Sequence, residues 1–115
     1  MEKIHIIARF KLNTGKITEF QKGAEKCIAA TSTESGALLY DWFIDEQNLE
    51  CTVVETYKDS EAVLIHAENV NGPLSKLMEI ADLSLEVFGD PSVELRKVLK
   101  DMNVTAKPFF KGLQG

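Results

Sequence analysis

Three side chains that could move protons lie within twelve residues of one another: Glu55, Tyr57 and His66. An imidazole with a pKa of about 6.5 can remove a proton from a phenol at neutral pH. Two further aromatic residues, Tyr40 and Trp42, precede them in an apolar segment. We expect His66 and Glu55 to be the catalytic residues of a small-molecule cleft. Tyr40, Trp42 and Tyr57 are the residues expected to contact the substrate there.

Each of these residues also has a purely structural interpretation. His66 could be a core or interface histidine bonded to Glu55 or to a tyrosine hydroxyl, because structural networks also perturb titratable groups. Glu55 is expected to orient His66 or to bond the backbone rather than to act as a base. Aromatic side chains dominate protein cores as well as binding sites. The sequence leaves the catalytic and the structural interpretations of His66 open.

Composition and charge exclude several function classes. The formal net charge of -5 argues against a nucleic-acid partner, which needs a concentrated basic surface. No apolar run approaches the roughly 20 residues that cross a membrane, and the chain leads from Met1 straight into a strand-like segment. We therefore expect no membrane association and a cytoplasmic location. Cys27 and Cys51 lack metal-ligand spacing, and no glycine-rich phosphate loop is present, so no metal or other cofactor is expected.

The pattern of apolar residues predicts the elements that hold the candidate site. Strands are expected at 4–12, 38–45, 51–57, 83–87 and 104–110, and helices from 17, from 59 or 60 with an interruption at 71–73, and from 91. This order is β-α-β-β-α-β with an extra C-terminal helix and strand. It predicts an α+β, ferredoxin-like fold with an antiparallel sheet, in a single domain of residues 1–115.

The second and third strands give two more specific predictions. If a loop at 45–48 joins them, Trp42 lies opposite Cys51 and Tyr40 opposite Val53. The face that carries Tyr40, Trp42 and Tyr57 is too apolar for water, while helices cover one face only. We therefore expect a homodimer joined through the sheet faces of residues 38–44 and 51–57.

The order of elements, the pattern Glu55-x-Tyr57 and the position of His66 eleven residues after Glu55 resemble the antibiotic biosynthesis monooxygenase (ABM) domain. The resemblance covers residues 4 to about 110. It implies a dimeric α+β barrel, with the histidine of the second helix facing a cleft between that helix and the sheet. The family includes quinol and anthrone oxygenases that use neither metal nor flavin, because the substrate itself reduces oxygen.

The resemblance thus implies a cofactor-independent monooxygenase acting on a small electron-rich aromatic such as a quinol. The alternative is a dimeric protein that binds a small molecule without chemistry. Haem-degrading relatives carry an asparagine in the first strand and a histidine late in the second helix region. Here Ala8 stands nearest the asparagine position and no histidine follows His66, so haem degradation is disfavoured.

Overall fold

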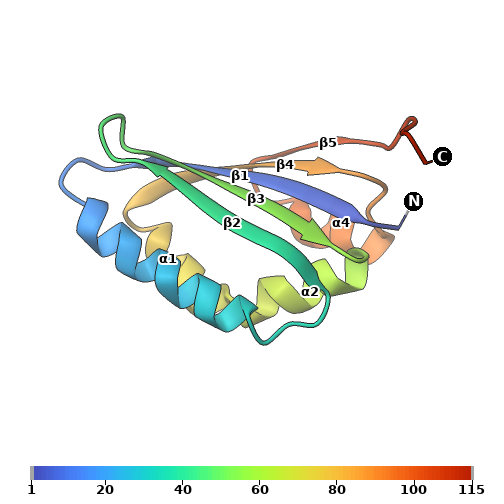
Figure 1. Cartoon of the computed structure of the whole chain (residues 1–115), viewed down its shortest axis with the longest axis horizontal. Coiled ribbons are helices and arrows are strands. Elements are labelled where there is room, and N and C mark those ends of the chain that lie inside the picture. The colour runs from blue at the N-terminus through green and yellow to red at the C-terminus, as the bar shows by residue number, and fades with distance from the viewer. Residues whose placement is uncertain (1, 115) are drawn as a thin grey trace.

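A five-stranded sheet with all its helices on one side forms the protein (Figure 1). The computed structural model describes residues 2–114. Its elements are β1 (Ile4–Leu12), α1 (Ile17–Thr31), β2 (Ala37–Asp45), β3 (Glu50–Tyr57), α2 (Ser60–Asn69), α3 (Asn71–Leu77), β4 (Ala81–Phe88), α4 (Val93–Leu99) and β5 (Val104–Lys107). Across these described residues, every helix is too short or too polar to cross a membrane.

The sheet confirms the predicted ferredoxin-like arrangement. Its strand order is β2-β3-β1-β4-β5, and the first four strands pair antiparallel throughout. The added strand β5 pairs parallel to β4, so the complete sheet is mixed rather than antiparallel. Parallel neighbours need a crossover connection, which α4 provides between them.

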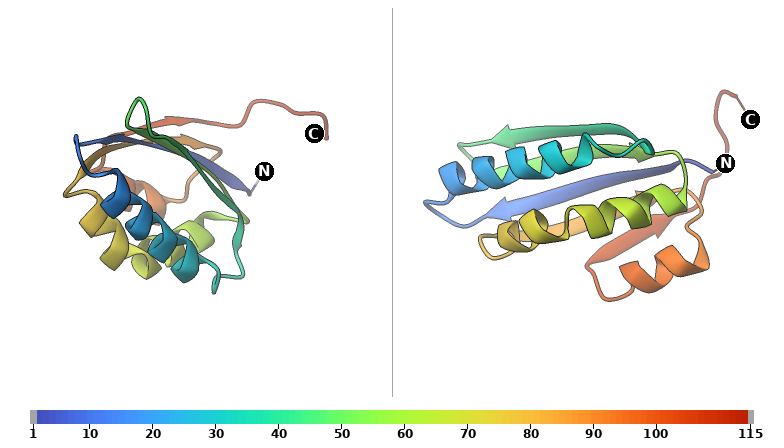
Figure 2. Two further views of the ribbon diagram at one scale, coloured as in Figure 1. Left: turned by 60° about the vertical axis from the view of Figure 1, so that its left-hand side comes forward. Right: turned by 90° about the horizontal axis from the view of Figure 1, so that it is seen from below.

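The core lies between the sheet and the helices. Successive side chains of a strand point to opposite faces, and those of β1 alternate between buried and more exposed positions. From α1, Phe20 and Cys27 reach the same layer, and the Phe20 ring meets Phe10 edge to face at 5.1 Å. Figure 2 shows the helices on one side of the sheet, while the opposite face carries none. We call that second surface the open face.

The hairpin between β2 and β3 differs from the predicted register by two residues. Asp45 stays in the strand and pairs with Glu50, so Trp42 lies opposite Val53 and Tyr40 opposite Glu55. The turn takes residues 46–49. The Asp45 carboxylate accepts hydrogen bonds from the backbone N–H of Asn48 (3.1 Å) and from its side chain (2.8 Å). These bonds hold the turn at 46–49, one residue later than the predicted 45–48. A shift of the turn by one residue changes the pairing of the two strands by two.

The prediction of which face lacks a helical cover was wrong. Tyr40, Trp42, Val53 and Tyr57 lie against the helices, and Tyr57 is fully buried. The alternate residues of the same strands form the open face. Among them Leu39 and Phe43 are large and exposed, and Phe43 has 58% of its surface exposed. Any second copy that covers the sheet must therefore contact this other set of side chains.

Candidate functional site

A cavity of about 80 Å³ lies between the sheet and helices α2, α3 and α4. Its wall is apolar except for four side chains: Tyr40, Trp42, Glu55 and His66. All four belong to the residues singled out from the sequence. Tyr57, the fifth, does not line the cavity; it lies fully buried behind Glu55. In the described part of the chain no group of three or more histidine, cysteine or carboxylate side chains is placed to hold a metal ion.

Helix α2 carries His66 to the cavity. Asp59 caps the start of this helix, because its carboxylate accepts a hydrogen bond from the backbone N–H of Ala62 at 2.9 Å. His66 then follows Val63 by one turn, on the buried side of α2. The Tyr40 ring meets the imidazole edge to face with centroids 4.9 Å apart. These contacts place the imidazole between the helix and the sheet.

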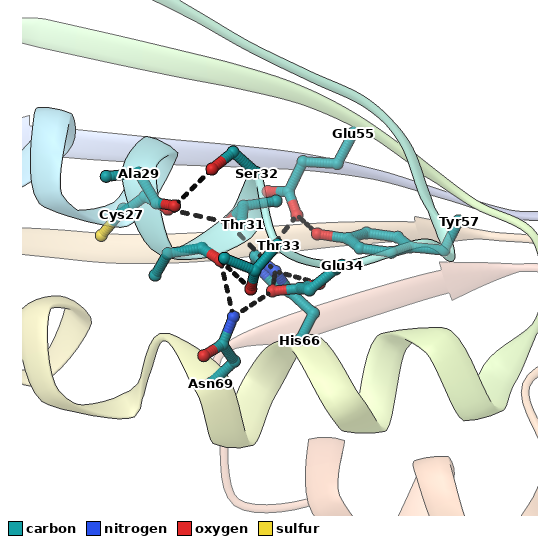
Figure 3. A network of polar contacts seen from close by, with 11 residues as sticks. Cys27, Ala29, Thr31, Ser32, Thr33, Glu34, Glu55, Tyr57, His66 and Asn69 are labelled. Carbon is teal, nitrogen blue, oxygen red and sulfur yellow. Dashed lines mark hydrogen bonds and ion pairs between the residues drawn. The ribbon is translucent and has the colours of Figure 1, made fainter.

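The main hydrogen-bond partner of His66 is Glu34, in the segment that joins α1 to β2 (Figure 3), and the Thr31 hydroxyl lies 3.4 Å from the same Nδ1. His66 Nδ1 lies 3.2 Å from each Glu34 carboxylate oxygen. The Glu34 side chain is only 4% exposed, and the Asn69 side-chain amide donates to its Oε2 at 2.8 Å. Asn69 also donates to the backbone carbonyl of Ala30 at 2.8 Å, which ties this group to α1.

This arrangement fixes which nitrogen of His66 is free. A carboxylate only accepts hydrogen bonds, so the Nδ1–H of His66 donates to Glu34 and the Nε2 lone pair remains available. Burial lowers the pKa of His66, and the Glu34 carboxylate partly offsets that effect. The imidazole is therefore neutral at pH 7 and can accept a proton at Nε2.

Glu55 faces His66 across the site with a second set of bonds. The Tyr57 hydroxyl donates to Glu55 Oε1 at 2.6 Å, and the same oxygen lies 3.9 Å from His66 Nε2. Burial raises the pKa of Glu55 to about 7, although the hydrogen bond from Tyr57 acts in the opposite direction. At neutral pH this carboxyl is consequently protonated in a large share of the molecules.

Trp42 presents the last polar group of the wall. Its ring stacks on Phe10 with centroids 5.8 Å apart and an interplanar angle of 18°. Its indole Nε1–H is buried and has no hydrogen-bond partner among residues 2–114. An unpaired buried donor costs about 1–3 kcal/mol, so a ligand with an acceptor atom at this place would recover that free energy.

The sequence did not reveal three residues of this network. Glu34, Asn69 and Thr31 were not among the candidates. Glu55, the expected partner of His66, does face its Nε2, but at 3.9 Å, which is an ion-pair distance and too long for a hydrogen bond. Glu34 follows a helix in an irregular segment where no periodicity marks a buried side chain. Asn69 does stand three residues after His66, at helical spacing, and this is the one signal that could have pointed to it.

Comparisons with known proteins add the family context. The family model described as "Antibiotic biosynthesis monooxygenase" matches residues 3–70. No curated protein matches the chain at a significant level. Among solved structures, MupZ from Pseudomonas fluorescens is 21% identical with a TM-score of 0.88, over 98% of this chain and 94% of that one.

Two further solved structures match less of the chain. SnoaB, a cofactor-independent oxygenase from Streptomyces nogalater, is 11% identical with a TM-score of 0.68, over 81% of this chain and 97% of that one. Rv0793 from Mycobacterium tuberculosis is 18% identical with a TM-score of 0.69, over 78% and 96% of the two chains. These likenesses establish a shared fold, and the match to MupZ extends into the C-terminal helix and strand.

Proposed function

The chain belongs to the antibiotic biosynthesis monooxygenase family, and we propose that it is a cofactor-independent monooxygenase acting on a small electron-rich aromatic such as a quinol. One observation carries the proposal. A neutral imidazole lines an apolar cavity, with its Nδ1 held by a buried carboxylate and its Nε2 free. A phenolic substrate in that cavity would meet a positioned base.

In the proposed reaction His66 Nε2 removes a phenolic proton, and Glu34 stabilises the resulting imidazolium. The phenolate donates electrons to oxygen more readily than the phenol does. The apolar wall excludes water from the reactive intermediate. For a quinol the balance is one quinol and one O₂ giving one hydroxyquinone and one water, so the ring supplies all four electrons. Glu55 supplies a proton to the oxygen atom that leaves as water.

The size of the cavity sets a condition on this proposal. Its 80 Å³ is well below the roughly 150 Å³ of an apolar cavity that holds benzene. A wall must therefore move to admit a ring. Helix α4 is the wall that we expect to move, because it is seven residues long, only Leu95 is buried in it, and Val98 is 46% exposed.

We also infer a homodimer in which a second copy covers the open face. Phe43 and Leu39 are exposed there on either side of Asp41. Asp41 pairs with Val54, which in turn pairs with Ile7. Large exposed apolar side chains on a sheet face without helices favour an interface. A two-fold contact lets the same patch cover itself.

Oxygen uptake with a panel of quinols tests the proposed function. The wild-type protein should consume oxygen and give a product that carries one atom from ¹⁸O₂, whereas His66→Ala should lose about 100-fold or more of this activity. Saturable quinol binding without oxygen uptake would instead favour the alternative function, a dimeric protein that binds a small molecule without chemistry. The unpaired Nε1–H of Trp42 supports that alternative, because it could bind an acceptor atom of the ligand.

A further inference from the structure

The cavity contains more proton-transfer groups than an oxygenase reaction needs at its start. A base alone is sufficient to deprotonate a quinol. Here His66 and Glu55 both line the cavity, and His66 Nε2 lies 3.9 Å from Glu55 Oε1. This separation is too long for a hydrogen bond between them and short enough for one small group to touch both. Each is held from behind, His66 by Glu34 and Glu55 by Tyr57.

We propose that this cavity also catalyses the enolisation of small uncharged ketones without oxygen. His66 Nε2 would take a proton from the carbon beside the carbonyl, while the Glu55 carboxylic acid gives a proton to the carbonyl oxygen. The proposal uses the same two side chains as the proposed oxygenase and does not depend on that activity.

The step is balanced without any co-reactant. The C–H bond breaks and its electron pair forms the carbon–carbon double bond of the enol. The π pair of the carbonyl forms the new O–H bond with the proton from Glu55. The products are the enol, an imidazolium and a carboxylate, and nothing is oxidised or reduced. The reverse step restores both side chains and returns a proton to the same carbon or to a conjugated one.

The charge states at neutral pH suit this step. Catalysis needs neutral His66 and protonated Glu55 together. Burial lowers the pKa of His66 and raises that of Glu55 to about 7, so both required states coexist near pH 7. The titratable groups that face the pair are Glu34, Tyr40, Tyr57 and Cys27. Burial raises the pKa of the two tyrosines and of Cys27 (to about 11), so these three stay neutral.

The wall of the cavity indicates the class of ketone. Among residues 2–114 no lysine or arginine lines it, so no described side chain there would neutralise a carboxylate or a phosphate. Its apolar surface and its 80 Å³ volume favour a small uncharged molecule. The unpaired Nε1–H of Trp42 offers one more contact to an oxygen acceptor of that molecule.

Deuterium exchange under argon tests the inference. Acetone, which is smaller than a ring, and the more acidic 2-tetralone, which enters only if the wall moves as proposed for a quinol, are incubated with the protein in D₂O buffer near neutral pH, and loss of the α-hydrogen signals is followed by NMR. The wild-type protein should exchange at least one probe about 10-fold or more above the rate with His66→Ala. Glu55→Gln keeps an acceptor for Tyr57 but cannot donate a proton as an acid. Its exchange rate should therefore also fall toward that of His66→Ala.

The matched control is His5→Ala, which removes the other histidine of the chain. His5 bonds Thr56 on the sheet and lies outside the cavity, so this variant should exchange at the wild-type rate. The wild-type rate should rise with pH through the pKa of His66 and fall above about pH 7, and Glu55→Gln should lack the falling part. Equal exchange by wild type, His66→Ala and Glu55→Gln, each shown to be folded by circular dichroism, would overturn the inference.

The outcome is separable from that of the proposed oxygenase. Exchange under argon together with no oxygen uptake in air would support the enolisation and overturn the oxygenase. Oxygen uptake with no ketone exchange would overturn the enolisation and leave the oxygenase standing.

Discussion

Replacement of Glu34 by glutamine tests whether this carboxylate prepares His66 for catalysis. Glutamine keeps the size of the side chain and removes its charge. In the native protein one carboxylate accepts from both His66 Nδ1 (3.2 Å) and the Asn69 amide (2.8 Å). A glutamine keeps one acceptor oxygen, which at the place of Oε2 can accept from both partners, but it removes the negative charge and the second acceptor that faces His66 Nδ1.

The expected magnitude follows from the charge that is lost. A hydrogen bond to a charged group contributes about 1.5–3 kcal/mol, and one between neutral groups about 0.5–1.5 kcal/mol. Each 1.36 kcal/mol of barrier is tenfold in rate, so the difference of about 1–1.5 kcal/mol should lower kcat for quinol oxidation about 5- to 10-fold in Glu34→Gln. Glu34 also raises the pKa of His66 against the effect of burial. The fall of kcat at low pH, which follows protonation of His66, should therefore occur at lower pH in the variant.

Steady-state oxygen uptake between about pH 5 and pH 9 measures both effects. KM should change little, because Glu34 lies behind His66 and does not line the cavity. Glu68→Gln is the control, since it removes an exposed carboxylate from the same helix as His66. Unchanged kcat and an unchanged fall of kcat at low pH in folded Glu34→Gln would refute the positioning role, as would an equal loss in the control.

Other perturbations have equally definite outcomes. His66→Ala should lower turnover by about 100-fold or more with its circular dichroism spectrum intact; a lower melting temperature with normal residual turnover would instead mark a structural histidine. The pKa of Glu55 is raised from 4.5 to about 7 in the folded protein, so its burial costs stability progressively as pH rises through this range. Glu55→Gln lacks this cost, and its stability relative to wild type in urea unfolding should increase by about 3 kcal/mol from pH 4 to pH 8; a constant difference would contradict the assignment. Trp42→Phe should weaken quinol binding about 5- to 10-fold if the ligand accepts from the indole, and unchanged Kd by calorimetry would exclude that contact. Phe43→Asp should convert the inferred dimer to monomer in light scattering, and a wild-type monomer at micromolar concentration would disprove the dimer.

The sequence predicted the elements well because local rules determine them. The apolar alternation from Ile4 to Leu12 gave β1, and Asp59 marked the start of α2 as a cap residue. The sequence did not predict which face of the sheet the helices cover. Both faces of β2 carry apolar side chains, and a period of two says which residues share a face but not which face the helices cover.

The candidate site was predictable only where its residues lie in regular elements. Tyr40, Trp42, Glu55 and His66 meet around one cavity, as strand and helix patterns indicated. Glu34 reaches His66 from an irregular segment 32 positions earlier, and only the packing of α1 beside α2 brings the two together. The hairpin register failed for a similar reason, since two loops of equal length fit the sequence and the Asp45 bonds choose between them.

The cavity wall divides along the chain in a way that bears on how such proteins diversify. Every polar group of the wall lies within residues 3–70, the part that matches the family model. From the described residues after 70 the wall receives only apolar side chains: Leu74, Leu83, Leu85, Leu95, Val98, Leu99 and Met102. Mutations in the C-terminal part can therefore remodel the volume that a substrate fills while the proton-transferring groups stay intact. New substrate specificities can thus arise by mutation of residues 71–115, or be engineered by exchanging this part of the chain, while the proton-transferring residues within 3–70 are kept.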